Sequence, residues 1–101
     1  MASKKAGAPQ RRHYIANKNI RERVTPRMQA LVKEFGGVTA FAKASGVHPK
    51  YVYRWTSTGM VPNTDTLIRF RVLHNVSTEW LLFGRGERYI NGRKPKAAQA
   101  A

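Results

Sequence analysis

Apolar residues recur at helical spacing in the stretch after residue 24. Met28, Leu31, Val32 and Phe35 stand at positions i, i+3, i+4 and i+7, which places them on one face of an α-helix. A threonine followed by a proline, at 25 and 26, is a usual helix start, and the two glycines at 36 and 37 are a usual end. The pattern predicts an amphipathic helix that begins after Thr25 and buries its apolar face.

Four shorter helices are predicted downstream from their start and stop signals. Proline opens one of them at its first turn, and Gly46, Gly59 and Gly84 follow predicted helix ends. Thr39, the pair at 63 and 64, and Ser77 are the expected N-caps of the others. The predicted ranges are Ala40–Ser45, Pro49–Ser57, Asp65–His74 and Thr78–Phe83. Helices joined by such short loops favour an all-α fold, a compact domain of five helices.

The length of 101 residues and an apolar content of 42% allow one domain with flexible ends. We expect residues 1–24 to form a flexible basic N-terminal arm and residues 25–84 to form the helical domain. Residues 85–101 are expected to be a flexible basic C-terminal tail, within which 88–90 have the composition of a short strand before an Asn-Gly turn signal.

Positive charge is the main feature of the composition. Nineteen lysines and arginines oppose five acidic residues, a formal net charge of +14, and much of the excess lies in residues 1–25 and 84–101. A chain of this kind attracts polyanions, of which nucleic acid is the commonest, although an anionic membrane or simple solubility is an alternative. The chain has no cysteine, no apolar run long enough to cross a bilayer and no secretory signal, so we expect a cytoplasmic protein.

Five positions between 42 and 55 have the residue types that a helix-turn-helix requires. Ala42 is small where the two helices cross, and Gly46 tolerates the positive φ of the turn. Val47 is apolar at the corner, and Val52 and Trp55 can hold the second helix against the core. The spacing therefore predicts a helix-turn-helix motif.

The second helix of this motif divides into two faces. Its predicted packing face consists of Tyr51, Val52 and Trp55. The other face is polar and basic, as expected of a helix that lies in the DNA major groove, and consists of Lys50, Tyr53, Arg54 and Ser57. The remaining predicted DNA contacts lie at helix starts and in the N-terminal arm; they are Thr39, His48, Pro49, Arg11 and Arg12.

Residues Gly37–Gly84 resemble the Cro and repressor class of phage-type helix-turn-helix regulators. The segment VTAFAKASGVHPKYVYRWTS, residues 38–57, carries the resemblance most strongly, and NVSTEWLLFG, residues 75–84, is similar to the closing helix of the class. The resemblance implies a lambda-repressor-like domain that binds an operator in double-stranded DNA, usually as a homodimer; whether dimerisation requires DNA stays open. Arg71 and His74 depart from the class, which usually has alanine and a large aliphatic residue at these positions.

No catalytic or metal-binding pattern is recognisable in the sequence. The three histidines are scattered, acidic residues are few, and no glycine-rich phosphate loop is present. We therefore expect neither an enzyme nor a metal, cofactor or small-molecule ligand.

Three functions compete. The leading hypothesis is a transcriptional regulator, a phage or prophage repressor of the Cro type, in a bacterial cell or an infected host. The alternatives are the antitoxin of a toxin–antitoxin pair, which also represses its own operator, and an architectural DNA-binding protein of weak specificity.

Overall fold

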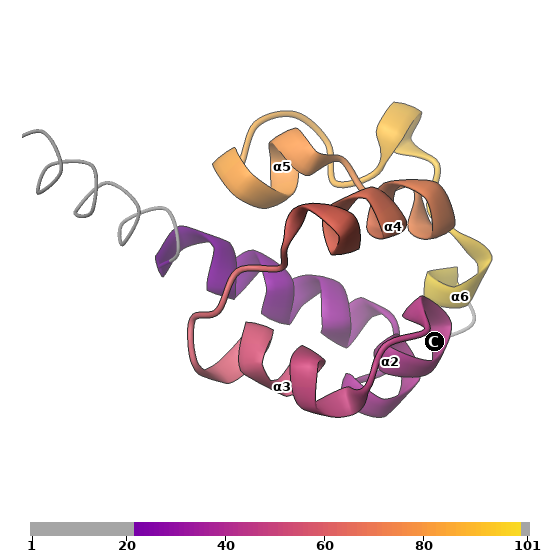
Figure 1. Ribbon diagram of the computed structural model, residues 1–101. Helices are drawn as coiled ribbons and strands as arrows, with labels where there is room; N and C mark the ends of the chain where they lie inside the picture. The colour runs from indigo at the N-terminus through magenta and orange to yellow at the C-terminus, as the bar shows by residue number, and fades with distance from the viewer. Residues whose placement is uncertain (1–21, 100–101) are drawn as a thin grey trace, which may run out of the picture.

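The computed structural model describes residues 22–99, and its arrangement of helices is drawn in Figure 1. A long first helix covers residues 22–34 of the described chain. The named helices that follow it are α2 (Val38–Ser45), α3 (Pro49–Ser57), α4 (Thr64–His74), α5 (Thr78–Phe83), the 3₁₀ turn η1 (Ile90–Gly92) and α6 (Lys96–Gln99). The prediction of an all-α fold is confirmed for this part of the chain, where the one extended pairing is an antiparallel bridge between Val76 and Tyr89.

The first helix buries the predicted stripe but includes residues that were expected to precede it. Met28, Leu31, Val32 and Phe35 are all buried, as the spacing indicates. The predicted start at Thr25 is wrong, because residues 22–25 are already helical. Val24 stands four residues before Met28 and is buried with it, so the apolar stripe extends beyond the proline at 26.

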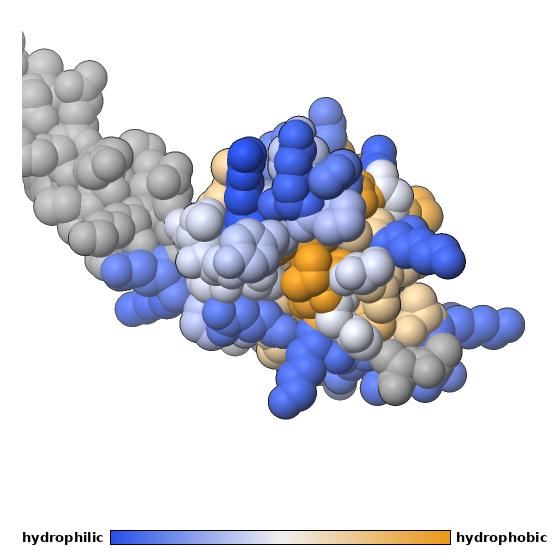
Figure 2. Space-filling model, turned by 90° about the horizontal axis from the view of Figure 1, so that it is seen from below, coloured by the Kyte–Doolittle hydropathy of each residue, from blue (hydrophilic) through white to orange (hydrophobic). Residues whose placement is uncertain are grey.

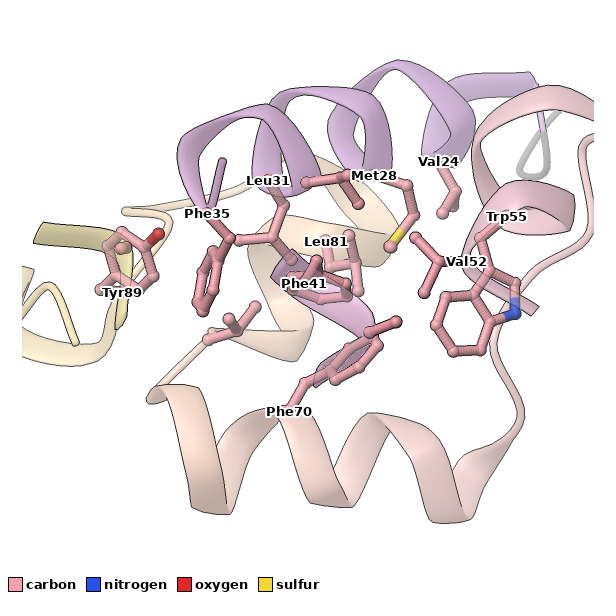
Figure 3. Packing of buried hydrophobic residues seen from close by; sticks show 14 residues of the cluster. Val24, Met28, Leu31, Phe35, Phe41, Val52, Trp55, Phe70, Leu81 and Tyr89 are labelled. Atoms are coloured by element: carbon pink, nitrogen blue, oxygen red, sulfur yellow. The ribbon is translucent and has the colours of Figure 1, made fainter. Parts of the chain in front are cut away.

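Aromatic rings from three helices form the centre of the core (Figure 3). The rings of Phe35 and Phe41 meet edge to face with centroids 5.0 Å apart, and Phe41 meets Phe70 of α4 at 5.3 Å. Trp55 of α3 contacts Phe70 from the other side, at 5.5 Å. Edge-to-face pairs are the favoured arrangement of aromatic rings. This cluster therefore sets the relative positions of α2, α3 and α4.

Two arginine side chains join helices by satisfying carbonyl groups at helix ends. Arg27 of the first helix donates to the carbonyl oxygens of Leu81 (2.7 Å) and Leu82 (3.0 Å), in the last turn of α5. Arg69 of α4 donates to the carbonyls of Ser45 and Gly46, where α2 ends. The last carbonyls of a helix have no partner within it, and a cation there also interacts favourably with the helix dipole.

The segment after Gly84 packs on the helical domain, so the expectation of a flexible tail is wrong for the described residues up to 99. Tyr89 and Ala98 are buried members of the core cluster. The Tyr89 hydroxyl donates to Glu34 of the first helix, and Arg88 and Lys94 lie 3.0 and 3.8 Å from the other oxygen of the same carboxylate. Asn75 fixes the backbone of this segment by donating to the carbonyl of Ile90. Helix α6 was not predicted.

Charge and burial set the protonation of the Tyr89–Glu34 pair. Burial and the neighbouring carboxylate raise the pKa of Tyr89, so its hydroxyl keeps the proton that it donates. Burial acts to raise the pKa of Glu34 as well. The hydrogen bonds from Tyr89 and Arg88, and the positive charges of Arg88 and Lys94, nevertheless bring that pKa below its ordinary value.

Candidate nucleic-acid interface

Helix α3 begins at a cap that its own sequence provides. His48 is the N-cap, and its Nδ1 accepts a hydrogen bond from the backbone N–H of Lys50 at 3.1 Å. Pro49 follows in the first turn, where its missing N–H removes no helical hydrogen bond. His48 and Pro49 are both exposed. The two residues expected to contact DNA at this position therefore also define where α3 begins.

The inner face of α3 is held by the core and by the first helix. Val52 and Trp55 are buried, and Trp55 packs against Phe70. Gln29 of the first helix donates from Nε2 to the carbonyl of Thr56 at 2.8 Å, near the C-terminal end of α3. A helix fixed at its middle and at its end presents its opposite face in a defined orientation.

The outer face of α3 consists of exposed polar and basic side chains. Its members are those that the sequence predicts, namely Lys50, Tyr53, Arg54 and Ser57. Tyr53 is 60% exposed, and α3 contains no acidic residue that would neutralise its two cations. Figure 2 views the molecule from below, the side on which α3 lies in Figure 1, and shows hydrophilic side chains around an apolar area at its centre.

Tyr51 does not belong to the packing face, contrary to the sequence prediction. It is 41% exposed, and the Lys50 ammonium and the Arg54 guanidinium lie 5.3 and 5.9 Å from the centroid of its ring. Cations at this distance are attracted to an aromatic ring. Residue 51 lies at the edge between the two faces of α3, and its ring orders the two basic side chains of the outer face.

The turn between α2 and α3 has the geometry that the helix-turn-helix pattern requires. Gly46 has φ 69° and ψ 33°, in the left-handed region, and its N–H caps α2 by donating to the carbonyls of Ala42 and Lys43. Ala42 is buried, as expected of the small residue at the helix crossing. The N–H of Val47 also donates to the carbonyl of Ala42, at 3.1 Å. The turn therefore closes tightly onto α2.

Thr39 is exposed in the first turn of α2, but it is not the cap that the sequence predicts. The helix begins at Val38, with Gly37 as its N-cap and no side-chain hydrogen bond at the cap. Gly37 has φ 115°, a conformation that a threonine would adopt only with strain. The double glycine therefore moves the helix start forward, and Thr39 remains at the N-terminal end with its side chain toward solvent.

A groove separates α3 from α4 on the side of the Gly46 turn. Its volume is about 600 Å³, and its walls include Tyr51, Trp55 and Met60 on one side and Asn63 and Arg69 on the other. Within the described residues, no cluster of three or more His, Asp or Glu side chains could hold a metal ion, and no helix has the length and apolar character to cross a membrane.

Sequence reasoning placed seven of the nine candidate site residues on described parts of the chain. All seven lie at or near the N-terminal end of α2 and along α3, and all are exposed. Arg11 and Arg12 lie outside the described residues. Sequence reasoning missed the role of Arg69, whose contacts with the α2 end reach across 23 and 24 residues and leave no local signal.

No protein-family model, curated protein or solved structure matches the chain.

Proposed function

We propose that this protein is a sequence-specific regulator of transcription that binds double-stranded DNA, a repressor of the Cro type, and that α3 enters the major groove of its operator. The observation that supports this most directly is the outer face of α3. It carries exposed, unneutralised Lys50 and Arg54 on a helix whose opposite face is locked by Val52 and Trp55. A rigid helix with such a face matches the width and the acceptor groups of the major groove.

Each side chain of the outer face has a distinct role in this proposal. Arg54 donates a pair of hydrogen bonds to the O6 and N7 acceptors of guanine, and Lys50 reaches a neighbouring acceptor. Tyr53 contacts a thymine methyl group or a phosphate. His48 and Thr39, at the N-terminal ends of α3 and α2, lie where backbone N–H groups and the helix dipole favour a phosphate.

One recognition helix reads only a few base pairs, so we propose a homodimer on DNA that reads two half-sites. The half-sites would be separated by about one helical turn, roughly 34–36 Å, because both recognition helices must enter the same side of the duplex. The net charge of +14 opposes association of free protomers, and neutralisation by DNA phosphates relieves this repulsion.

Selection from random duplex DNA tests the proposal. We expect an enriched motif with two related half-sites, bound by two copies of the chain. Arg54→Ala should relax the preference at one position of each half-site and cost about 1–3 kcal/mol of binding free energy. Lys96→Ala on α6, which also removes one exposed positive charge, is the matched control and should leave the motif unchanged. Equal affinity for selected and random DNA would instead identify an architectural protein.

A further inference from the structure

Helix α4 carries large apolar side chains on two opposite faces. Phe70 points from α4 into the core (Figure 3) and is buried. Ile68 and Val72 stand two positions before and after Phe70, which places them about 160° away from it around the helix. They are 56% and 74% exposed, and Val72 is the most exposed large apolar side chain of the described residues. The outward face of α4, defined by Ile68 and Val72, is therefore apolar and uncovered.

Such a face is unusual for a helix at a protein surface. Surface helices normally place polar residues opposite their buried stripe, as α3 does, whereas a helix that is apolar on both sides is normally covered on both sides. Single exposed apolar residues are common, but Ile68 and Val72 are spaced i, i+4 and form a continuous ridge. A ridge with this spacing packs against the groove of another helix.

The charges beside the ridge indicate what kind of helix would cover it. Arg69 and Arg71 each lie about 80° from the middle of the ridge, one on each side. Both are exposed, and neither forms an ion pair with an acidic side chain in the part of the chain that the structure describes. Arg71 donates to the amide oxygen of Asn75 at 3.2 Å, and Arg69 to backbone carbonyls. Both guanidinium groups keep their positive charge unneutralised.

A second copy of this chain is a poor occupant of the outward face. Each copy has a net charge of +14, and pairing α4 with α4 would bring the flanking arginines of both copies together. Like charges brought together at an interface oppose association, whereas acidic side chains at the same positions would pair with the arginines.

We propose that the outward face of α4 binds a partner protein through an amphipathic helix whose apolar stripe is flanked by aspartate and glutamate. The apolar stripe covers Ile68 and Val72, and the acidic residues pair with Arg69 and Arg71. This interaction does not depend on DNA binding. Figure 1 shows α4 across the upper half of the molecule and α3 along its lower edge, so the partner helix and the outer face of α3 occupy different sides.

Affinity selection with a displayed library of random 16-residue peptides tests the proposal on the full chain. We expect the enriched peptides to be negatively charged and to repeat apolar residues at i, i+3 or i+4. Their affinity should fall about tenfold or more, at least 1.4 kcal/mol, with Val72→Ser and with Arg71→Glu. Ala97→Ser, an exposed change on α6, is the control and should leave the affinity unchanged.

Thermal melts check that each variant folds, which is expected because Val72, Arg71 and Ala97 are all exposed. Peptides that bind the Val72→Ser variant equally well, or that lack net negative charge, would overturn the proposal. Sedimentation of the chain alone provides the second readout. A dimer that dissociates with Val72→Ser would identify a second copy as the occupant, and the acidic partner would then be rejected.

Discussion

The hydroxyl of Ser45 lies 2.8 Å from Nε2 of His74, and this contact joins the end of α2 to the last turn of α4. Both residues are almost completely buried, at 0% and 2% exposure. The imidazole ring also contacts Phe35, with centroids 4.7 Å apart. A buried ring nitrogen needs a hydrogen-bond partner, and Ser45 provides it. The two residues together fill a position at which the repressor class usually has one large aliphatic side chain.

We expect the stability of the domain to decrease as the pH falls below the ordinary pKa of imidazole, about 6.5. Burial lowers the pKa of His74, against a smaller opposite contribution from the backbone of Leu73. Between the two pKa values the unfolded chain binds a proton that the folded chain does not, so protonation favours unfolding. Urea denaturation at a series of pH values from 7 to 5 measures the decrease.

The double variant Ser45→Ala, His74→Leu separates this titration from others. It removes both hydrogen-bonding groups together and leaves no buried polar group without a partner. Its stability should vary less between pH 7 and 5 than that of the unsubstituted chain. An identical pH dependence in the two proteins would show that another group titrates over this range.

Trp55→Ala and Arg54→Ala should have opposite effects, although the residues are neighbours. Trp55 is buried against Phe70, so its removal leaves a cavity and should cost about 3–5 kcal/mol of folding free energy. Arg54 is exposed, and Arg54→Ala should melt close to the unsubstituted chain. Thermal melts of the two variants test this orientation of α3. An early melt of Arg54→Ala would mean that α3 faces the wrong way.

Gly46→Val should destabilise the turn between α2 and α3. Residue 46 has a φ of 69°, which a β-branched side chain adopts only with strain of about 1–3 kcal/mol. Steric crowding contributes little, because an added Cβ would lie 3.5 Å from the Arg69 guanidinium. Gly46→Asn is the matched control, since asparagine tolerates this conformation better, and it should lose less stability in chemical denaturation. Equal losses would assign the effect to lost space instead of backbone strain.

Removing residues 87–101 should lower the melting temperature. The truncation deletes Tyr89 and Ala98 from the core and removes the hydrogen bond from Tyr89 to Glu34. Tyr89→Phe deletes that hydrogen bond alone and should cost about 1–3 kcal/mol, less than the truncation. Calorimetry of both proteins measures the two losses. If this segment were the flexible tail that the sequence predicts, truncation would leave the melt unchanged.

Local signals in the sequence determined the bounds of the later helices. The predicted ranges Pro49–Ser57 and Thr78–Phe83 are confirmed, and α4 begins one residue before its predicted start. Side-chain caps at His48, Asn63 and Ser77 lie within three residues of the groups they bond. The exposure of the predicted recognition face follows from the same local periodicity.

Contacts between distant residues decided what the sequence did not reveal. The first helix includes residues before Thr25 because Val24 is buried in the tertiary core. The segment after Gly84 is ordered on the domain by Glu34, which lies 55 residues before its partner Tyr89. His74 lies in the core because Ser45, 29 residues earlier, supplies its hydrogen bond. Helix caps depend on neighbours in the chain, whereas burial and charge pairing depend on which residues folding brings together, and one-dimensional patterns do not contain that information.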